Sequence, residues 1–79
     1  MIIVRYFAGA RAAAGVETET RSAATLDELV GAITAEHGER LARVLTACSF
    51  LVDGTTTRDR ATPLAPGAVV DVLPPFAGG

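Results

Sequence analysis

The chain has 79 residues, of which 49% are hydrophobic and 20% are charged, and its formal net charge is −2. This length allows one domain, and the composition is that of a globular protein and not of a disordered one. The acidic balance and the absence of a basic block argue against nucleic acid as the main partner. One Cys cannot form an internal disulfide. The first apolar run ends at Arg5, so it predicts neither a signal peptide nor a membrane span, and we expect a cytoplasmic protein.

The first third of the chain predicts two strands around a short connection. Residues 2–7 alternate so that Ile2, Val4 and Tyr6 share one face, which is the better core candidate because the other face carries Arg5. Residues 8–15 contain Gly9 and end at Gly15, which predicts a compact turn or a short helical connection between the two glycines. Residues 16–21 alternate small or β-branched with charged residues, which predicts a strand with one solvated face, antiparallel to the first.

A helix is predicted from Thr25 to Gly38. Thr25 to Glu28 form a capping box, in which the Thr25 hydroxyl accepts from the backbone amide three residues on and Glu28 reaches back. Gly38 is well placed to end the helix. The apolar stripe follows helical spacing: Leu26, Leu29, Val30 and Ile33. The stripe requires a sheet to cover.

The second half predicts short elements. Residues 40–46 have helical spacing but are few, which favours a single turn of α- or 3₁₀-helix. Residues 50–52 predict a strand that enters an Asp53-Gly54 turn, with a short return strand over 55–57. Pro63 and Pro66-Gly67 mark a turn before the last strand.

The end of the chain is its most informative stretch. Residues 69–73 predict a strand, and Pro74 and Pro75 end it because they have no N–H for a sheet ladder. We therefore divide the chain into a domain over 1–73 and an extended tail over 74–79. The tail ends in Phe76, Ala77, Gly78 and Gly79. Four residues beyond Pro75 add about 13–14 Å of reach, and glycines without Cβ atoms can pass a narrow channel.

The terminal carboxylate is ionised at neutral pH, because its pKa is normally about 3.3–3.7. It is therefore a competent nucleophile toward a nucleotide phosphate. Attack on ATP would give an acyl-adenylate, which a sulfur donor could convert to a thiocarboxylate without help from side chains of this chain. The plainer interpretation is that Gly78-Gly79 is a frayed end or a cloning scar.

The order strand, strand, helix, short strands, final strand predicts an α+β fold. One main helix would cross a mixed sheet of about four to five strands, with the first and last strands adjacent and parallel at its centre. This is the β-grasp arrangement.

The chain resembles the ubiquitin-like sulfur carriers of the MoaD/ThiS group, and within it the small subunits of molybdopterin synthase. The resemblance covers essentially the whole sequence. The motifs that carry it are Tyr6-Phe7-Ala8, Arg11 before Gly15, the capped helix from Thr25, Val52-Asp53-Gly54, Pro63-Leu64, and Leu73-Pro74-Pro75-Phe76-Ala77-Gly78-Gly79. The Pro-Pro-x-x-Gly-Gly ending favours the molybdopterin branch. The chain departs from the group at residues 55–59, which are wholly polar where such carriers often present an apolar residue to the partner.

The resemblance implies a function as well as a fold. An E1-like enzyme would adenylate the Gly79 carboxylate with ATP, a sulfur donor enzyme would supply the sulfur, and a large subunit of the MoaE type would use it to convert cyclic pyranopterin monophosphate to molybdopterin. The small subunit would bind no permanent cofactor and would not be an enzyme by itself. Carriers for thiamin thiazole or cysteine synthesis remain alternatives, as do a protein modifier and a plain β-grasp interaction module.

Three residues are predicted to contact partners. Phe7 and Leu73 would form an exposed apolar patch at the root of the tail, and the resemblance places Arg11 near the contact with the activating enzyme. Other reactive side chains have simpler roles: His37 as a helix-terminal cap or surface residue and Cys48 as a small core hydrophobe. No spacing suggests a metal site.

Overall fold

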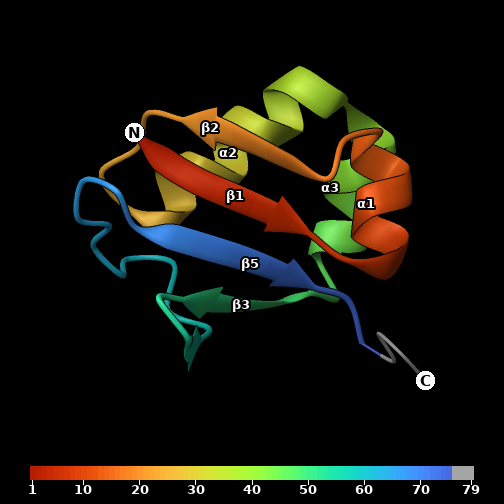
Figure 1. The fold of residues 1–79 in the computed structure, drawn as a ribbon. Coiled ribbons are helices and arrows are strands. Elements are labelled where there is room, and N and C mark those ends of the chain that lie inside the picture. The colour runs from red at the N-terminus through yellow and green to blue at the C-terminus, as the bar shows by residue number, and fades with distance from the viewer. Residues whose placement is uncertain (76–79) are drawn as a thin grey trace.

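The computed structural model of the protein describes residues 1–75. Within them, five strands form one mixed sheet in the order β2-β1-β5-β3-β4 (Figure 1). The elements are β1 (Ile2–Tyr6), α1 (Ala8–Ala14), β2 (Thr18–Arg21), α2 (Leu26–His37), α3 (Glu39–Leu45), β3 (Ser49–Val52), β4 (Thr55–Thr57) and β5 (Val69–Leu73). β1 and β5 are parallel neighbours at the centre, and every other pair is antiparallel. The predicted β-grasp arrangement is confirmed.

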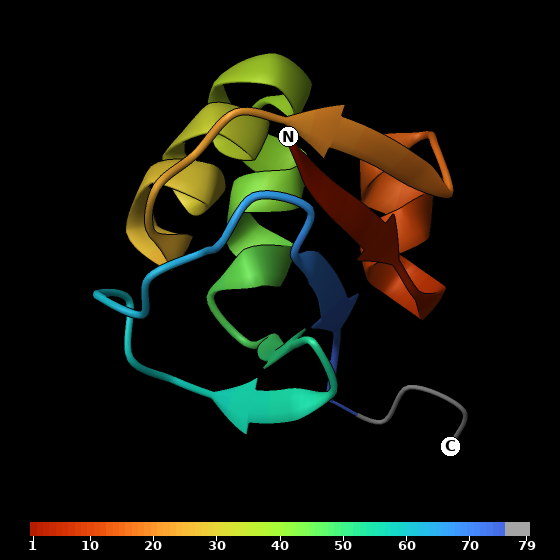
Figure 2. The same cartoon turned by 60° about the vertical axis from the view of Figure 1, so that its left-hand side comes forward.

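One face of the sheet carries the hydrophobic core. The predicted alternation of β1 is confirmed, because Ile2, Val4 and Tyr6 are buried while the residues between them are exposed. The helices lie against this face (Figure 2), with α1 contacting α3 and α3 contacting α2. The largest fully buried side chains come from both layers: Tyr6, Ile2, Leu26, Leu29, Ile33, Leu41, Val4, Val70 and Val72. None of the helices in residues 1–75 has the length and apolar character needed to cross a membrane.

The predicted helix is α2, and its capping differs in one detail. The Thr25 hydroxyl accepts from the Glu28 amide at 3.2 Å, as the capping box requires. The Glu28 carboxylate, however, accepts from the amide of Ala24 at 3.1 Å, one residue before the helix cap. The helix ends at His37, and Gly38 follows with a φ of 86°. Gly38 is suited to this left-handed backbone because it has no Cβ.

The short elements were less well predicted. Residues 8–14 and 39–45 form α-helices of seven residues each, so α2 is the main helix but not the only one. Seven residues give too little periodicity for a firm prediction, and such helices depend on tertiary packing, here through buried Ala10, Leu41 and Leu45. β2 begins at Thr18 and not at Val16, and α1 joins it to β1.

The Asp53-Gly54 turn is confirmed, and it also attaches the β3–β4 hairpin to β5. Both residues have positive φ, at 48° and 85°, as in the turn that two-residue hairpin loops prefer. The Asp53 carboxylate accepts from the Val69 amide at 2.9 Å, and the Asp53 amide donates to the Val69 carbonyl at 2.8 Å. The hairpin is therefore fixed to the start of the last strand.

Candidate functional site

The root of the tail is fixed on both sides at the centre of the sheet. β5 ends at Leu73, directly before the two prolines, where the missing N–H groups were expected to end it. On one side, Leu73 pairs with Ser49 of β3. On the other side, the Phe7 amide donates to the Val72 carbonyl at 3.2 Å. The direction in which the tail leaves is therefore set by two neighbouring strands.

Pro74 is half-buried against this root, and Pro75 is exposed. The predicted tail residues Phe76, Ala77, Gly78 and Gly79 lie outside the described residues. Their roles in threading and activation stay predictions.

Phe7 lies beside the root with an exposed side chain. It is 39% exposed, whereas Leu73 is half-buried. Because Tyr6 is in register with Val72, the next residues along, Phe7 and Leu73, lie at the same level on the face opposite the core. An exposed aromatic side chain beside a half-buried aliphatic one forms a small apolar patch at the point where the tail begins. We call Phe7 and Leu73 the root patch.

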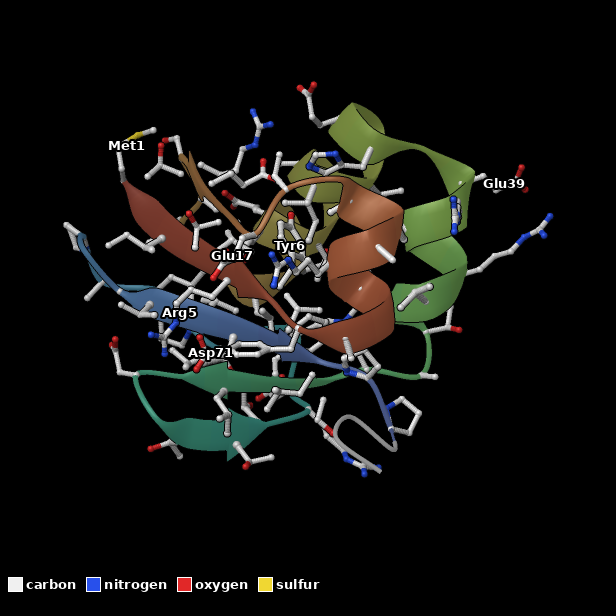
Figure 3. All side chains as sticks on the ribbon, turned by 45° about the vertical axis from the view of Figure 1, so that its right-hand side comes forward. Met1, Arg5, Tyr6, Glu17, Glu39 and Asp71 are labelled. Carbon is white, nitrogen blue, oxygen red and sulfur yellow. The ribbon has the colours of Figure 1, made fainter. Side chains whose placement is uncertain are left out.

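The middle of the same face carries an ion pair. Arg5 Nε donates to Asp71 Oδ1 at 2.5 Å and Arg5 Nη2 donates to Oδ2 at 2.8 Å, in the bidentate geometry that an arginine fork favours. Figure 3 shows the two side chains together on this face. The hydrogen bonds and the charge of Asp71 raise the pKa of Arg5 above its ordinary value. The pair accounts for the polar break in the otherwise apolar last strand, which the sequence alone did not explain.

Arg11 lies on α1, exposed to solvent, and its Nη2 is 3.4 Å from Glu17 Oε2. A pocket of about 260 Å³ is lined by several residues, among them Arg5, Phe7, Arg11 and Glu17. The structure thus brings Arg11 and Phe7 to the same pocket, and Phe7 to the level of Leu73. Whether the three contact a partner stays a prediction.

A second polar cluster was not predicted from the sequence. Glu19 on β2 accepts from the Tyr6 hydroxyl at 2.9 Å and from Arg21 Nε at 2.6 Å, and it contacts His37 Nε2 at the end of α2. Arg21 also approaches Glu36 at 3.3 Å. The cluster ties the edge strand to the main helix. The predicted cap or surface role of His37 was therefore incomplete, since its side chain is only 13% exposed and contacts β2.

The environment of this cluster shifts two pKa values. Burial is the largest effect on Glu19 and would raise its pKa, but hydrogen bonds from His37, Tyr6 and Arg21 outweigh it and leave the pKa lowered. Burial, together with the bond to Glu19, raises the pKa of Tyr6. The cluster therefore holds a carboxylate anion and a neutral phenol. A signal existed in the sequence, because Tyr6 and Glu19 lie on adjacent antiparallel strands, but only the tertiary structure adds the helix end.

The remaining candidate groups are not arranged for acid–base or metal chemistry. Cys48 is half-buried, packs against the core and donates to the Val44 carbonyl at 3.1 Å. Burial raises the pKa of its thiol, which disfavours the reactive thiolate. Across residues 1–75, no three His, Cys, Asp or Glu side chains gather as metal ligands. Within this part of the chain, the feature best suited to function is the tail root with its apolar patch.

Comparisons with known proteins fit this architecture. A model of the ThiS family matches residues 4–79, almost the whole chain and its Gly-Gly end. The chain belongs to the ThiS family. It is thus a small ubiquitin-like protein of the ThiS/MoaD sulfur-carrier type. Comparison with curated protein sequences gave no significant match.

Solved structures match nearly the whole chain, with coverage of 95% or more in each of the three that follow. One is a complex of subunits 1 and 2 of molybdopterin-converting factor from Helicobacter pylori, with 32% identity, a TM-score of 0.75 and coverage of 99% of this chain and 97% of that one. A putative molybdopterin converting factor subunit 1 from Pyrococcus furiosus has 27% identity, a TM-score of 0.79 and coverage of 95% and 97%. The small archaeal modifier protein 1 of Methanosarcina acetivorans has 22% identity, a TM-score of 0.86 and coverage of 99% and 95%, and this likeness concerns the fold.

Proposed function

We propose that this protein carries sulfur as a thiocarboxylate on Gly79 and delivers it in molybdopterin biosynthesis. The family match that extends through Gly79 carries the proposal. The 32% identity to a subunit that was solved in complex with its second subunit supports the molybdopterin branch and a protein partner. The Pro-Pro-x-x-Gly-Gly ending of the sequence supports the same branch.

The chemistry needs only the terminal carboxylate from this chain. A carboxylate oxygen attacks the α-phosphate of ATP in the active site of an E1-like enzyme, and pyrophosphate leaves. Hydrosulfide then attacks the acyl carbon and displaces AMP. With hydrosulfide as the donor, the products are the thiocarboxylate, AMP and a proton. The acid–base groups and the metal ions that assist these steps belong to the partner enzymes in this proposal.

The described residues serve to position the tail for this reaction. β5 holds the tail root between β1 and β3, and the two prolines stiffen the first residues beyond it. The root patch offers the apolar area that a partner needs beside the entrance of its channel. A tail that leaves a rigid sheet in a fixed direction loses less conformational entropy when the channel accepts it.

Intact-mass measurement tests the proposal. The protein is incubated with its cognate activating enzyme, ATP and sulfide, and the expected product has gained the mass of one oxygen-to-sulfur exchange, located at Gly79 by fragmentation. A variant that lacks Gly79 is the matched control, and it should keep its melting temperature and lose the mass shift. An unchanged mass with an enzyme that is active on another carrier would refute the proposal. The pathway is tested by transfer of the sulfur to cyclic pyranopterin monophosphate with a MoaE-type subunit. Transfer to a thiazole precursor or a cysteine precursor instead would assign the carrier to that other pathway.

One observation favours a second candidate, a protein modifier. The fold is similar to that of the small archaeal modifier protein 1 over 99% of this chain. A modifier would attach Gly79 to lysines of target proteins, which appear as shifted bands on a denaturing gel. The chain itself has seven Arg and no Lys, so it offers no lysine side chain to which further copies of this protein could be attached.

A further inference from the structure

A second pocket lies on the other side of the tail root from Phe7. It has a volume of about 240 Å³ and is lined by the end of α3, the start of β3, and Arg58 and Arg60 beyond β4. Ser49, one of its lining residues, pairs directly with Leu73. Since neighbouring strands are about 4.8 Å apart, the pocket begins one strand away from the root of the tail. We call it the arginine pocket.

The two arginines differ in how firmly they are held. The Arg60 guanidinium lies 5.9 Å from the centre of the Phe50 ring, within the range of a cation–π contact, and its Nη1 is 3.5 Å from Asp27. Phe50 is buried, and its contact with Arg60, together with that of Asp27, holds Arg60 at the pocket. Arg58 is exposed and makes no ion pair with any residue from 1 to 75. The pocket therefore combines one positioned cation with one that is available for a ligand.

The end of α3 does little to neutralise this charge. Carbonyl groups at a helix C-terminus carry partial negative charge when they lack donors. Here the Arg43 carbonyl accepts from the Thr46 hydroxyl at 2.7 Å, and the Val44 carbonyl accepts from the Cys48 thiol at 3.1 Å. The Leu45 carbonyl accepts from the Cys48 amide at 3.2 Å. With these carbonyls occupied, the helix end adds little negative charge. Arg60 is already close to the Asp27 carboxylate, so Arg58 is the cation of the pocket that no carboxylate of residues 1–75 pairs with.

We propose that the arginine pocket receives an acidic side chain of the activating enzyme when that enzyme takes up the tail. The inference rests on the proposed function, because it assigns a contact to the enzyme that activates Gly79. A protein that encloses the tail must approach its root, and the arginine pocket continues the surface around that root. We assign the contact to the activating enzyme because every pathway considered for this carrier requires one, whichever molecule finally receives the sulfur. A carboxylate suits the pocket, since guanidinium groups in its lining donate charge-assisted hydrogen bonds to such a group.

The test measures adenylation of the carrier by its cognate activating enzyme, as pyrophosphate release against carrier concentration. Arg58→Glu should raise the KM for the carrier roughly tenfold with little change in kcat, because the contact is made in docking and not in the chemical step. Arg40→Glu is the matched control, since Arg40 is also exposed and also makes no ion pair within the described part of the chain, but lies outside the pocket. Its KM should stay within about twofold. Both variants should keep the wild-type melting temperature.

A second arm identifies the contact. Acidic residues of the enzyme are changed to Arg one at a time, and one of them should restore the low KM of the Arg58→Glu carrier while impairing the wild-type carrier. Equal KM values for Arg58→Glu and Arg40→Glu would overturn the inference, and so would the absence of any rescuing position. These results are distinct from a failure of the proposed function, in which the wild-type carrier itself would release no pyrophosphate with an active enzyme.

Discussion

Truncation of Phe7 gives the sharpest test of the root patch. Phe7 is 39% exposed, and a Phe side chain buries about 200 Å² when it is fully covered. A partner that covers the exposed part removes about 80 Å² from water, worth about 2 kcal/mol at about 25 cal/mol per Å². Since about 1.4 kcal/mol corresponds to a factor of ten, Phe7→Ala should weaken binding to the activating enzyme about 30-fold.

Ile3→Ala is the matched control for this experiment. Ile3 lies on β1, and Phe7 directly follows that strand on the same face. Ile3 is 38% exposed, nearly the same as Phe7, but it stands four residues earlier, about 13 Å from the tail root. Both affinities are measured by calorimetry at a temperature where circular dichroism shows each variant folded. Ile3→Ala should bind within about threefold of the wild type. If the two variants lose equal affinity, or neither loses any, docking does not centre on the root patch and the reasoning is refuted.

Three further predictions concern stability. Glu19→Ala leaves the buried Tyr6 hydroxyl without its acceptor and should cost about 3 kcal/mol, which lowers the melting temperature by about 12–24 °C. Glu17→Ala removes an exposed carboxylate and its surface ion pair with Arg11 and should cost no more than about 0.5 kcal/mol, so similar losses in both variants would contradict the cluster's role. Because the folded-state pKa of Glu19 is lowered, the stability that its carboxylate contributes should be fully present above about pH 4.3 and lost as the pH falls through the lower folded value. The difference in melting temperature between the wild type and Glu19→Gln should therefore shrink on acidification, and a difference that stays constant would contradict this. Gly54 has a φ of 85°, whereas Gly31 lies within α2 with open space around the position of a Cβ atom. In urea titrations, Gly54→Ala should lower the free energy of unfolding by about 1 kcal/mol and Gly31→Ala should raise it by about the same amount, and a shift of the same sign in both would refute the backbone argument.

Features that depend on neighbours in sequence were predicted well. The alternation in β1, the cap at Thr25, the Asp53-Gly54 turn and the end of β5 before Pro74 each arise from local rules of period, hydrogen bonding or missing N–H groups. The short helices α1 and α3 were predicted less firmly, because seven residues carry little periodic signal and depend on packing.

Polar side-chain contacts between residues far apart in the sequence were missed. Asp71 appeared as a polar break in an apolar strand, and its partner Arg5 is 66 residues away, set beside it only by the parallel register of β1 and β5. His37 was predicted as a helix cap from its place in the last turn of α2. Its contact with Glu19 joins that helix to β2, and the local sequence does not show such a contact. The arginine pocket likewise joins the ends of α3 and β3 to the segment after β4.

The sequence by itself determined the family, the order of the elements and the Gly-Gly end on which the proposed chemistry depends, because these are properties of consecutive residues. The sequence also predicted Phe7 and Leu73 at the root of the tail, and only the tertiary structure placed the arginine pocket beside them. Placing β5 between β1 and β3 puts Phe7 on one side of that root and the arginine pocket on the other. Such a juxtaposition depends on strand register and helix packing, to which local sequence rules do not extend.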